Sequence, residues 1–289
     1  MLIKGREEGG ACHSPVRREK KMRYARILIM FSATLLASGL PTLGQNMPNI
    51  QMPTSPSANI TVSPFDAAQF PMFTDFFTGA KAALQPVSLV LTNNSDKAIA
   101  GIEVEWVTIG SDGRERHVSS QSDNFFSRGS RAVAAAHDRL LVSPYGFLSE
   151  STVNWIKSGA GHSGVIAGGG GADFDLASQV RISLDCVVFE DGEVVGPNQR
   201  RYTDEIQARR DAANEVVQVV QSALKQGLQP STVLSPLVNV TTRRGDFVGT
   251  WKVRYAQQLL RTPYLDVVLA SLENMPSPPK FYRTDGGQP

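Results

Sequence analysis

The residues best suited to nucleophilic chemistry lie in a glycine-rich stretch in the second half of the chain. Gly161-His162-Ser163-Gly164 comes close to the G-x-S-x-G elbow that exposes a nucleophilic serine, but Val165 occupies the position of the second glycine. The elbow also needs a strand that runs directly into a helix, whereas glycine-rich sequence surrounds this serine. His117 and the pair His137-Asp138 could complete a triad only through the tertiary fold. The spacing therefore predicts a flexible loop.

The remaining polar residues do not predict a metal, cofactor or phosphate site. The histidines after residue 45 form no H-x-x-x-H pair, and no cysteine pair accompanies them, so the usual zinc patterns are missing. Asp173 and Asp175 follow Gly168–Gly171 and offer hard oxygen ligands, but calcium takes roughly six to eight oxygens and the residues beyond Asp175 do not supply them. The same glycines lack the Lys-Ser/Thr ending of a P-loop. We expect no metal and no cofactor.

Paired carboxylates and one cysteine complete the candidates. Glu103 and Glu105 point to the same side of an alternating segment, where burial would perturb both, but a solvated sheet face with weak repulsion is the preferred interpretation. The acidic residues at 190–193 suit a hairpin tip. Cys186 stands in an apolar register, where cysteine acts as a small hydrophobic residue. We assign no catalytic, cofactor-binding or metal-binding residue.

The start of the chain has the order of a secretory signal. Four basic residues at 20–26 precede the uncharged apolar run Ile27–Leu40, and a Pro/Gly/polar segment follows. The run is shorter than the ~20 residues that span a bilayer, which favours a cleaved signal over an anchor. We predict a leader at 1–45, cut between residues 39 and 45, and Met22 is a more natural start for it than Met1. The expected location is secreted or periplasmic, with no membrane span after signal removal.

Composition narrows the partners of the exported product. The chain has 29 basic and 27 acidic residues, of which eight and three lie in 1–45, so the rest is slightly acidic. A nucleic acid partner is not expected, because no basic run interleaved with aromatic residues is present. Cys186 is the only cysteine after the leader, so no internal disulfide can form. Stability must come from burial, for which roughly 240 residues are ample.

Strand patterns dominate from residue 58 to residue 198. Val87, Leu89 and Leu91 alternate before a polar turn, and the positions at 102, 104 and 106 alternate with Glu103 and Glu105. Residues 180–195 predict a hairpin with Asp191-Gly192 at its tip, and residues 180, 182, 184, 186 and 188 share its apolar face. Weaker strand patterns occur at 137–143 and 151–157. The phenylalanines at 65–77 predict a cap over the core, with an exposed binding face as the alternative.

Helical patterns follow. Thr203 can cap a helix over 203–226, whose apolar stripe includes Ile206, Val217 and Val220, and Gly227 ends it. Residues 251–260 are helical in composition, and Thr262-Pro263 predicts the start of another helix. The Pro-rich segment 46–57 predicts a flexible tether, and the tail from Pro276 predicts disorder.

The segment Val87 to Trp106 resembles the B and C strands of immunoglobulin-like domains, and the hairpin at 180–195 resembles strands F and G. The resemblance implies a mainly β fold, with an immunoglobulin-like antiparallel β-sandwich at 58–198 followed by a C-terminal α-helical extension at 199–289. Leu89 stands where a disulfide partner of Cys186 would be, and Leu184 replaces the tyrosine of a tyrosine corner. The resemblance is therefore to the architecture of bacterial exported sandwiches and not to antibody-like function.

For function we expect an exported, non-catalytic module that binds a protein or a glycan at the cell envelope or outside the cell. One alternative is a secreted hydrolase whose site is assembled only by the fold; another is an assembly subunit that uses the helix at 203–226. A pocket joining His137 or His162 to a serine and a carboxylate would favour the hydrolase. Exposed Trp or Tyr on a sheet face would favour a glycan, and an uncovered valine stripe would favour assembly. The oligomeric state stays open.

Overall fold

The computed structural model describes residues 48–126, 131–159, 174 and 177–284. Every element described below belongs to the unit Asn46–Pro289. The predicted signal and its cleavage site lie outside the described residues. So do four other features singled out above, namely Gly161–Gly164, Gly168–Gly171, Asp173 and Asp175.

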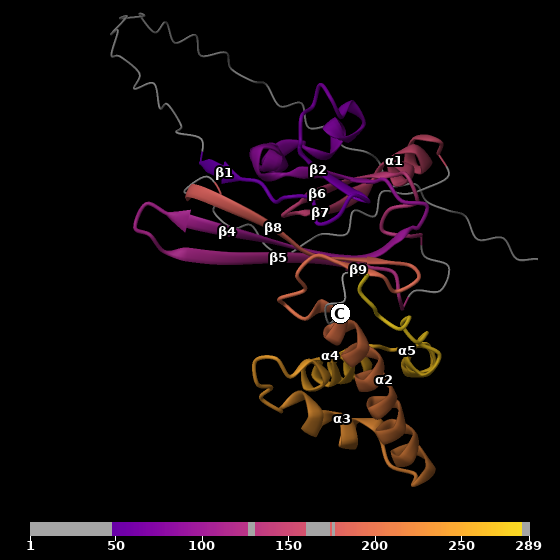
Figure 1. Cartoon of the computed structure of the whole chain (residues 1–289). Helices are drawn as coiled ribbons and strands as arrows, with labels where there is room; N and C mark the ends of the chain where they lie inside the picture. Colours follow the sequence, from indigo (N-terminus) through magenta and orange to yellow (C-terminus); the bar gives the residue numbers. More distant parts are fainter. Residues whose placement is uncertain (1–47, 127–130, 160–173, 175–176, 285–289) are drawn as a thin grey trace, which may run out of the picture. The chain divides into compact units, whose positions relative to one another are not determined.

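Two sheets carry the strands of the described chain (Figure 1). Sheet A has the strand order β1-β8-β4-β5, with the short β9 added to β8, and sheet B has the order β2-β3-β6-β7. The β1–β8 pair is parallel and the other pairs are antiparallel. Sheet A consists of β1 (Asn49–Gln51), β4 (Ile99–Gly110), β5 (Glu115–Asp123), β8 (Ala177–Phe189) and β9 (Val194–Val195). Sheet B consists of β2 (Ile60–Pro64), β3 (Leu89–Asn93), β6 (Arg139–Ser143) and β7 (Gly146–Ser149).

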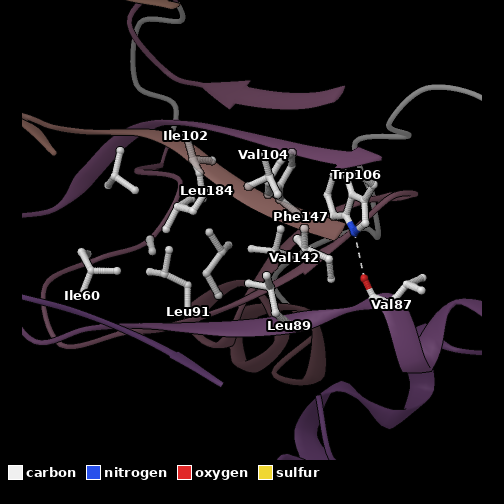
Figure 2. Close-up of a cluster of buried hydrophobic side chains, with 14 of the residues drawn as sticks. Ile60, Val87, Leu89, Leu91, Ile102, Val104, Trp106, Val142, Phe147 and Leu184 are labelled. Atoms are coloured by element: carbon white, nitrogen blue, oxygen red, sulfur yellow. Dashed lines mark hydrogen bonds between the residues drawn. The ribbon is translucent and has the colours of Figure 1, made fainter. Parts of the chain in front are cut away.

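Apolar side chains from both sheets meet in one core (Figure 2). Leu89 on β3 and Ile102, Val104 and Trp106 on β4 are completely inaccessible to solvent, which confirms the alternation predicted for these segments. The indole Nε1 of Trp106 donates a hydrogen bond of 2.8 Å to the carbonyl oxygen of Val87. The only polar atom of this side chain is therefore satisfied inside the core.

A β-bulge changes which residues of β8 face this core. Glu103 pairs with Cys186 but the next residue, Val104, pairs with Leu184, so Asp185 has no counterpart on β4. The extra residue reverses the facing of everything beyond it. Val187 joins the core between the sheets, whereas Cys186 packs in a separate cluster on the outer face of sheet A. The prediction of a single apolar face from residue 180 to residue 188 is wrong after Leu184.

The helices include two 3-10 segments and five α-helices. Their bounds are η1 (Pro71–Phe76), η2 (Gly79–Val87), α1 (Glu150–Lys157), α2 (Tyr202–Lys225), α3 (Pro230–Val238), α4 (Phe247–Arg261) and α5 (Leu265–Glu273). The helix predicted at 203–226 is confirmed within a residue at each end. Its apolar stripe is covered in two parts, because Ile206 packs on sheet A and Val217 and Val220 pack among α3, α4 and α5. The phenylalanines that cap the core, as predicted, are Phe70, Phe73, Phe76 and Phe77, all buried.

The strand predicted at 151–157 is wrong, because this segment forms α1. The Ser149 side chain accepts a hydrogen bond from the Thr152 backbone N–H, and Glu150 lies in the first turn, where the helix dipole favours a negative charge. These capping interactions outweigh the strand preference of Val153 and its neighbours.

Two segments expected to lack structure are partly ordered. Asn49–Gln51, inside the predicted tether, forms β1 beside residues 179–181 of β8. In the predicted disordered tail, Tyr282 pairs with Glu193 through hydrogen bonds to Gly192 and Val194. Gly192 has φ +93°, and a Cβ there would collide with the carbonyl oxygen of Lys280. The glycine at the hairpin tip therefore also makes room for the returning tail.

The fold class is mixed α/β, and the prediction of a mainly β, immunoglobulin-like sandwich is wrong. Helices account for 37% of the described residues and strands for 29%. The alanines and valines of α2 build a second apolar core with α3–α5, so these helices are a packed layer in their own right and not an appendage. Among the described helices, none is both long enough and apolar enough to cross a bilayer.

Candidate functional site

The described histidines, His117 and His137, do not form the triad that a hydrolase would need, and His162 lies outside the described residues. His137 has φ +58°, and its Nε2 lies 2.9 Å from Oδ1 of Asp96 on the surface. The neighbouring carboxylate of Asp138 is buried and accepts hydrogen bonds from the backbone N–H groups of Ala135, Arg139 and Ser151, which makes it a turn residue. Among the described residues, no serine is hydrogen-bonded to His137.

Two other sequence candidates have structural roles. Cys186 is inaccessible, and burial raises the pKa of its thiol, so the reactive thiolate is disfavoured. At the tip of the β8–β9 hairpin, Lys97 Nζ lies 2.6 Å from Asp191 and 2.8 Å from Glu193. These hydrogen bonds raise the pKa of Lys97. The acidic tip is therefore a local ion-pair site that also holds Tyr282, whose hydroxyl donates to Asp191.

The densest group of charges lies on the outer face of sheet A. We call it the sheet A charge cluster, and it consists of Glu103, Glu105, His117, Ser119 and Arg200. The guanidinium of Arg200 donates to Glu103 at 2.9 Å, to Glu105 at 2.6 Å and to the Ser119 hydroxyl at 3.2 Å. His117 Nδ1 lies 3.0 Å from Glu105, and its Nε2 lies 3.6 Å from Glu115. Both ring nitrogens thus face carboxylates, and the cluster holds ions rather than an activated serine.

Glu103 does not lie on a solvated face, so the interpretation of Glu103 and Glu105 as a weakly repelling exposed pair is wrong. The residue is only 5% exposed, and desolvation raises its pKa from 4.5 to about 7, against the opposing effect of Arg200. The carboxylates of Asp185 and Glu205 push the pKa in the same direction as desolvation. No local pattern indicated this, because the covering residues come from the loop before α2 and from α2 itself.

The β8 bulge positions Arg200. Asp185, the extra residue, accepts hydrogen bonds from the backbone N–H groups of Gln199 at 2.9 Å and Arg200 at 3.0 Å. Asn198, at φ +49°, accepts from the Tyr202 N–H and donates to the Thr203 hydroxyl. Residues 198–203 are therefore held as one turn that aims the Arg200 side chain across β4.

Replacing Asp185 with alanine is expected to release this turn. Two backbone donors lose their acceptor, and the expected decrease in the free energy of unfolding is about 1–3 kcal/mol. Urea denaturation checks the value, with Asp96→Ala as the matched control, because the Asp96 side chain is 97% exposed and pairs only with His137. Equal effects for the two variants would contradict the role assigned to Asp185.

A second ionic network joins α2 to β5 and α4. Arg209 donates to Asp123 and, at 3.3 Å, to Glu205, and its guanidinium stacks 4.5 Å from the ring centre of Trp251. Glu205 also accepts from Trp251 Nε1 at 3.1 Å and from Gln121 Nε2 at 3.3 Å. Side chains of three elements therefore depend on one buried arginine.

A groove of about 360 Å³ lies at the open edge of β8, and we call it the β8 edge groove. On this edge β1 pairs with β8 up to Arg181, and β9 begins to pair at Val187. Ile182–Leu184 pair with β4 on their other side, but on this side they have no strand partner among the described residues. The walls combine the segment after β1 with the loop after β9. The lining residues are Pro53, Thr54, Pro56, Ile182, Ser183, Leu184, Val195, Gly196, Pro197 and Arg283.

The described residues contain no group of three or more His, Cys, Asp or Glu side chains placed to hold a metal ion. The charge cluster and the groove were not found by sequence reasoning, although the Gly196-Pro197-Asn198 turn that borders both was visible in the sequence.

Comparison of the chain with protein-family models, with curated proteins and with solved structures finds no match. Function must therefore be argued from this geometry.

Proposed function

We propose that this protein is an exported, non-catalytic module that binds an extended segment of another protein in the β8 edge groove. Export is supported by the basic and apolar residues at 20–40 of the sequence. The observation that carries the binding proposal is the interruption between β1 and β9 on the same edge of β8. An unpaired sheet edge presents backbone donors and acceptors to which a further strand can add.

The lining of the groove suits a short extended peptide. The backbone of Ile182 and Leu184 forms its floor, because their side chains face the core between the sheets. Pro53, Pro56 and Pro197 provide rigid walls that have no backbone N–H group of their own. A guest strand would take its main-chain hydrogen bonds from β8 and place alternate side chains against these walls.

A protein partner is favoured over a glycan by the positions of the tryptophans. Trp106 is fully buried in the core between the sheets. Trp155 lies on α1 with Arg131 against its ring, and Trp251 lies on α4 between Arg209 and Arg254. Sugar-binding faces use exposed aromatic rings, and none of these three rings lies open on a sheet face. The exposed tyrosines Tyr145, Tyr264 and Tyr282 lie in the β6–β7 turn, directly before α5 and in the tail.

The test is selection of binding peptides from a displayed library of random heptapeptides on the full-length protein. The affinity of a selected peptide is then measured by calorimetry for the natural chain and for Thr54→Trp, which fills the groove from an exposed wall position. We expect the affinity of the peptide for Thr54→Trp to be at least tenfold lower than its affinity for the natural chain. Thr232→Trp, at an exposed position on α3, is the matched control and should bind as the natural chain does.

The mode of binding is tested with the peptide itself. A strand directs alternate N–H groups to opposite sides, so methylating every second backbone nitrogen removes the donors on one side only. Two such peptides are made, one for each set of nitrogens. We expect one of them to lose binding and the other to keep it. Equal binding by the natural chain and Thr54→Trp would overturn the site. Equal binding by both methylated peptides would overturn strand addition.

A further inference from the structure

A buried amide lies between two carboxylates on the outer face of sheet A. Gln121 is directly opposite Glu103 in the β4–β5 ladder, and its Nε2 donates to Glu205 on α2. Side chains directly opposite each other in an antiparallel pair have Cβ atoms about 5 Å apart on the same face. The amide has one donating end and one accepting end. Its Nε2 is used in the hydrogen bond to Glu205, and Oε1 can only accept.

The accepting end of this amide is unsatisfied in the described structure. Gln121 Oε1 and Glu103 Oε2 are both buried and have no hydrogen-bond partner. Both atoms are acceptors, and leaving two buried acceptors unpaired is costly. Glu205 has two further donors, Trp251 Nε1 and Arg209 Nη2, which suit an ionised carboxylate. Glu103 Oε2 has none, so the missing hydrogen belongs on Glu103.

We propose that Glu103 carries a proton on Oε2 and donates it to Gln121 Oε1, and that this proton is a latch between sheet A and α2. With the proton in place, hydrogen bonds run from Glu103 through Gln121 to Glu205. Without it, a buried negative charge faces an amide oxygen, and the amide is drawn away from Glu205. Ionisation of Glu103 therefore weakens the attachment of α2.

The surroundings of Glu103 fit a group that changes charge near neutral pH. Within the described part of the chain, Arg200 is the cation that pairs with Glu103, through Oε1, and Arg200 also pairs with Glu105. The other titratable or charged groups near it include His117 on β5, Asp185 and Cys186 on β8, and Tyr202, Glu205 and Arg209 on α2. Burial raises the pKa of Glu103 to about 7.

The direction of the pH effect follows from this shift. The folded protein holds the proton more tightly than the unfolded chain, whose carboxyl has a pKa of 4.5. The stabilisation is therefore fully present below that pKa and is lost as the pH rises through about 7. We expect the Tm to fall by roughly 5–10 °C from this group between about pH 5 and about pH 8.

Glu103→Gln supplies a permanent donor in place of the proton. We expect its Tm to lack this component of the pH dependence and to exceed that of the natural protein at about pH 8. Glu105→Gln is the matched control, because it removes the other partner of Arg200 but leaves Glu103 and Gln121 in place. The Tm of Glu105→Gln should still fall as the pH rises, as it does in the natural protein. The same pH profile in both variants would overturn the latch.

A direct measurement avoids dependence on any variant. In full-length protein labelled with ¹³C at glutamate carboxyls, Glu103 should titrate near neutral pH, and the indole N–H signal of Trp251, which donates to Glu205, should shift with the same midpoint. Titration of Glu103 near its ordinary value would overturn the proposal and leave a bridging water as the partner of both oxygens. A Trp251 signal that does not follow Glu103 would overturn the coupling to α2.

Discussion

Replacing Arg209 with alanine is expected to lower the free energy of unfolding by about 3–5 kcal/mol. The Arg209 side chain is 9% exposed, and its partners Asp123 and Glu205 are 11% and 15% exposed. Removing the arginine leaves two carboxylates in a poorly solvated place without a cation, which costs more than the pair itself contributes. Trp251 also loses one of the two guanidinium groups that lie over its ring.

Urea denaturation followed by circular dichroism measures the effect. Lys252→Ala is the matched control, because Lys252 pairs with Glu215 across a partly exposed surface and its loss should cost less than about 1 kcal/mol. An Arg209→Ala protein as stable as Lys252→Ala would show that the ionic network does not hold α2.

Replacing Trp106 with alanine is expected to cost about 3–5 kcal/mol. This side chain is completely buried between the two sheets, where its neighbours on β3 and β6 belong to packed strands that cannot collapse fully into the space left behind. The variant also leaves the carbonyl oxygen of Val87 without the indole donor. Both losses act on the same core.

Two variants separate these contributions. Trp106→Phe keeps most of the apolar volume but removes the hydrogen bond to Val87, and its expected cost is about 1–3 kcal/mol. Trp155→Ala, on the partly exposed face of α1, should cost less than Trp106→Ala because solvent can occupy the space. Thermal and urea denaturation check the order of the three. Equal losses for Trp106→Ala and Trp155→Ala would contradict the burial described here.

Local periodicity predicted the strands and helices well where one side of the element packs on an apolar core and the other side does not. The alternation of Leu89 and Leu91, and of Ile102 and Trp106, reflects contact with a single apolar layer, and these strands lie as predicted. The apolar stripe along α2 likewise marks the buried side of a helix, and this helix lies as predicted. Both patterns repeat at the period of the backbone itself, so they can be seen in a short window of residues.

The predictions failed where a few residues or a distant segment changed the outcome. One extra residue, Asp185, turned Cys186 away from the core between the sheets, and alternation alone does not reveal a bulge. Ser149 and Glu150 converted a strand-like segment into α1. The immunoglobulin-like interpretation counted strands but did not count the apolar surface that α3, α4 and α5 bury with α2, and so it missed the mixed α/β class.

The sequence by itself determined the strands around Leu89 and Trp106, the helix α2 and the apolar faces of these elements, together with a slightly acidic chain beyond residue 45 that contains one cysteine. Only the tertiary structure decided that Glu103 is buried and that the edge of β8 is open between β1 and β9. The physical reason is distance along the chain. Arg200 and Glu205 meet Glu103 from about a hundred residues away, and the solvation of a carboxylate depends on what packs over it rather than on its neighbours in sequence.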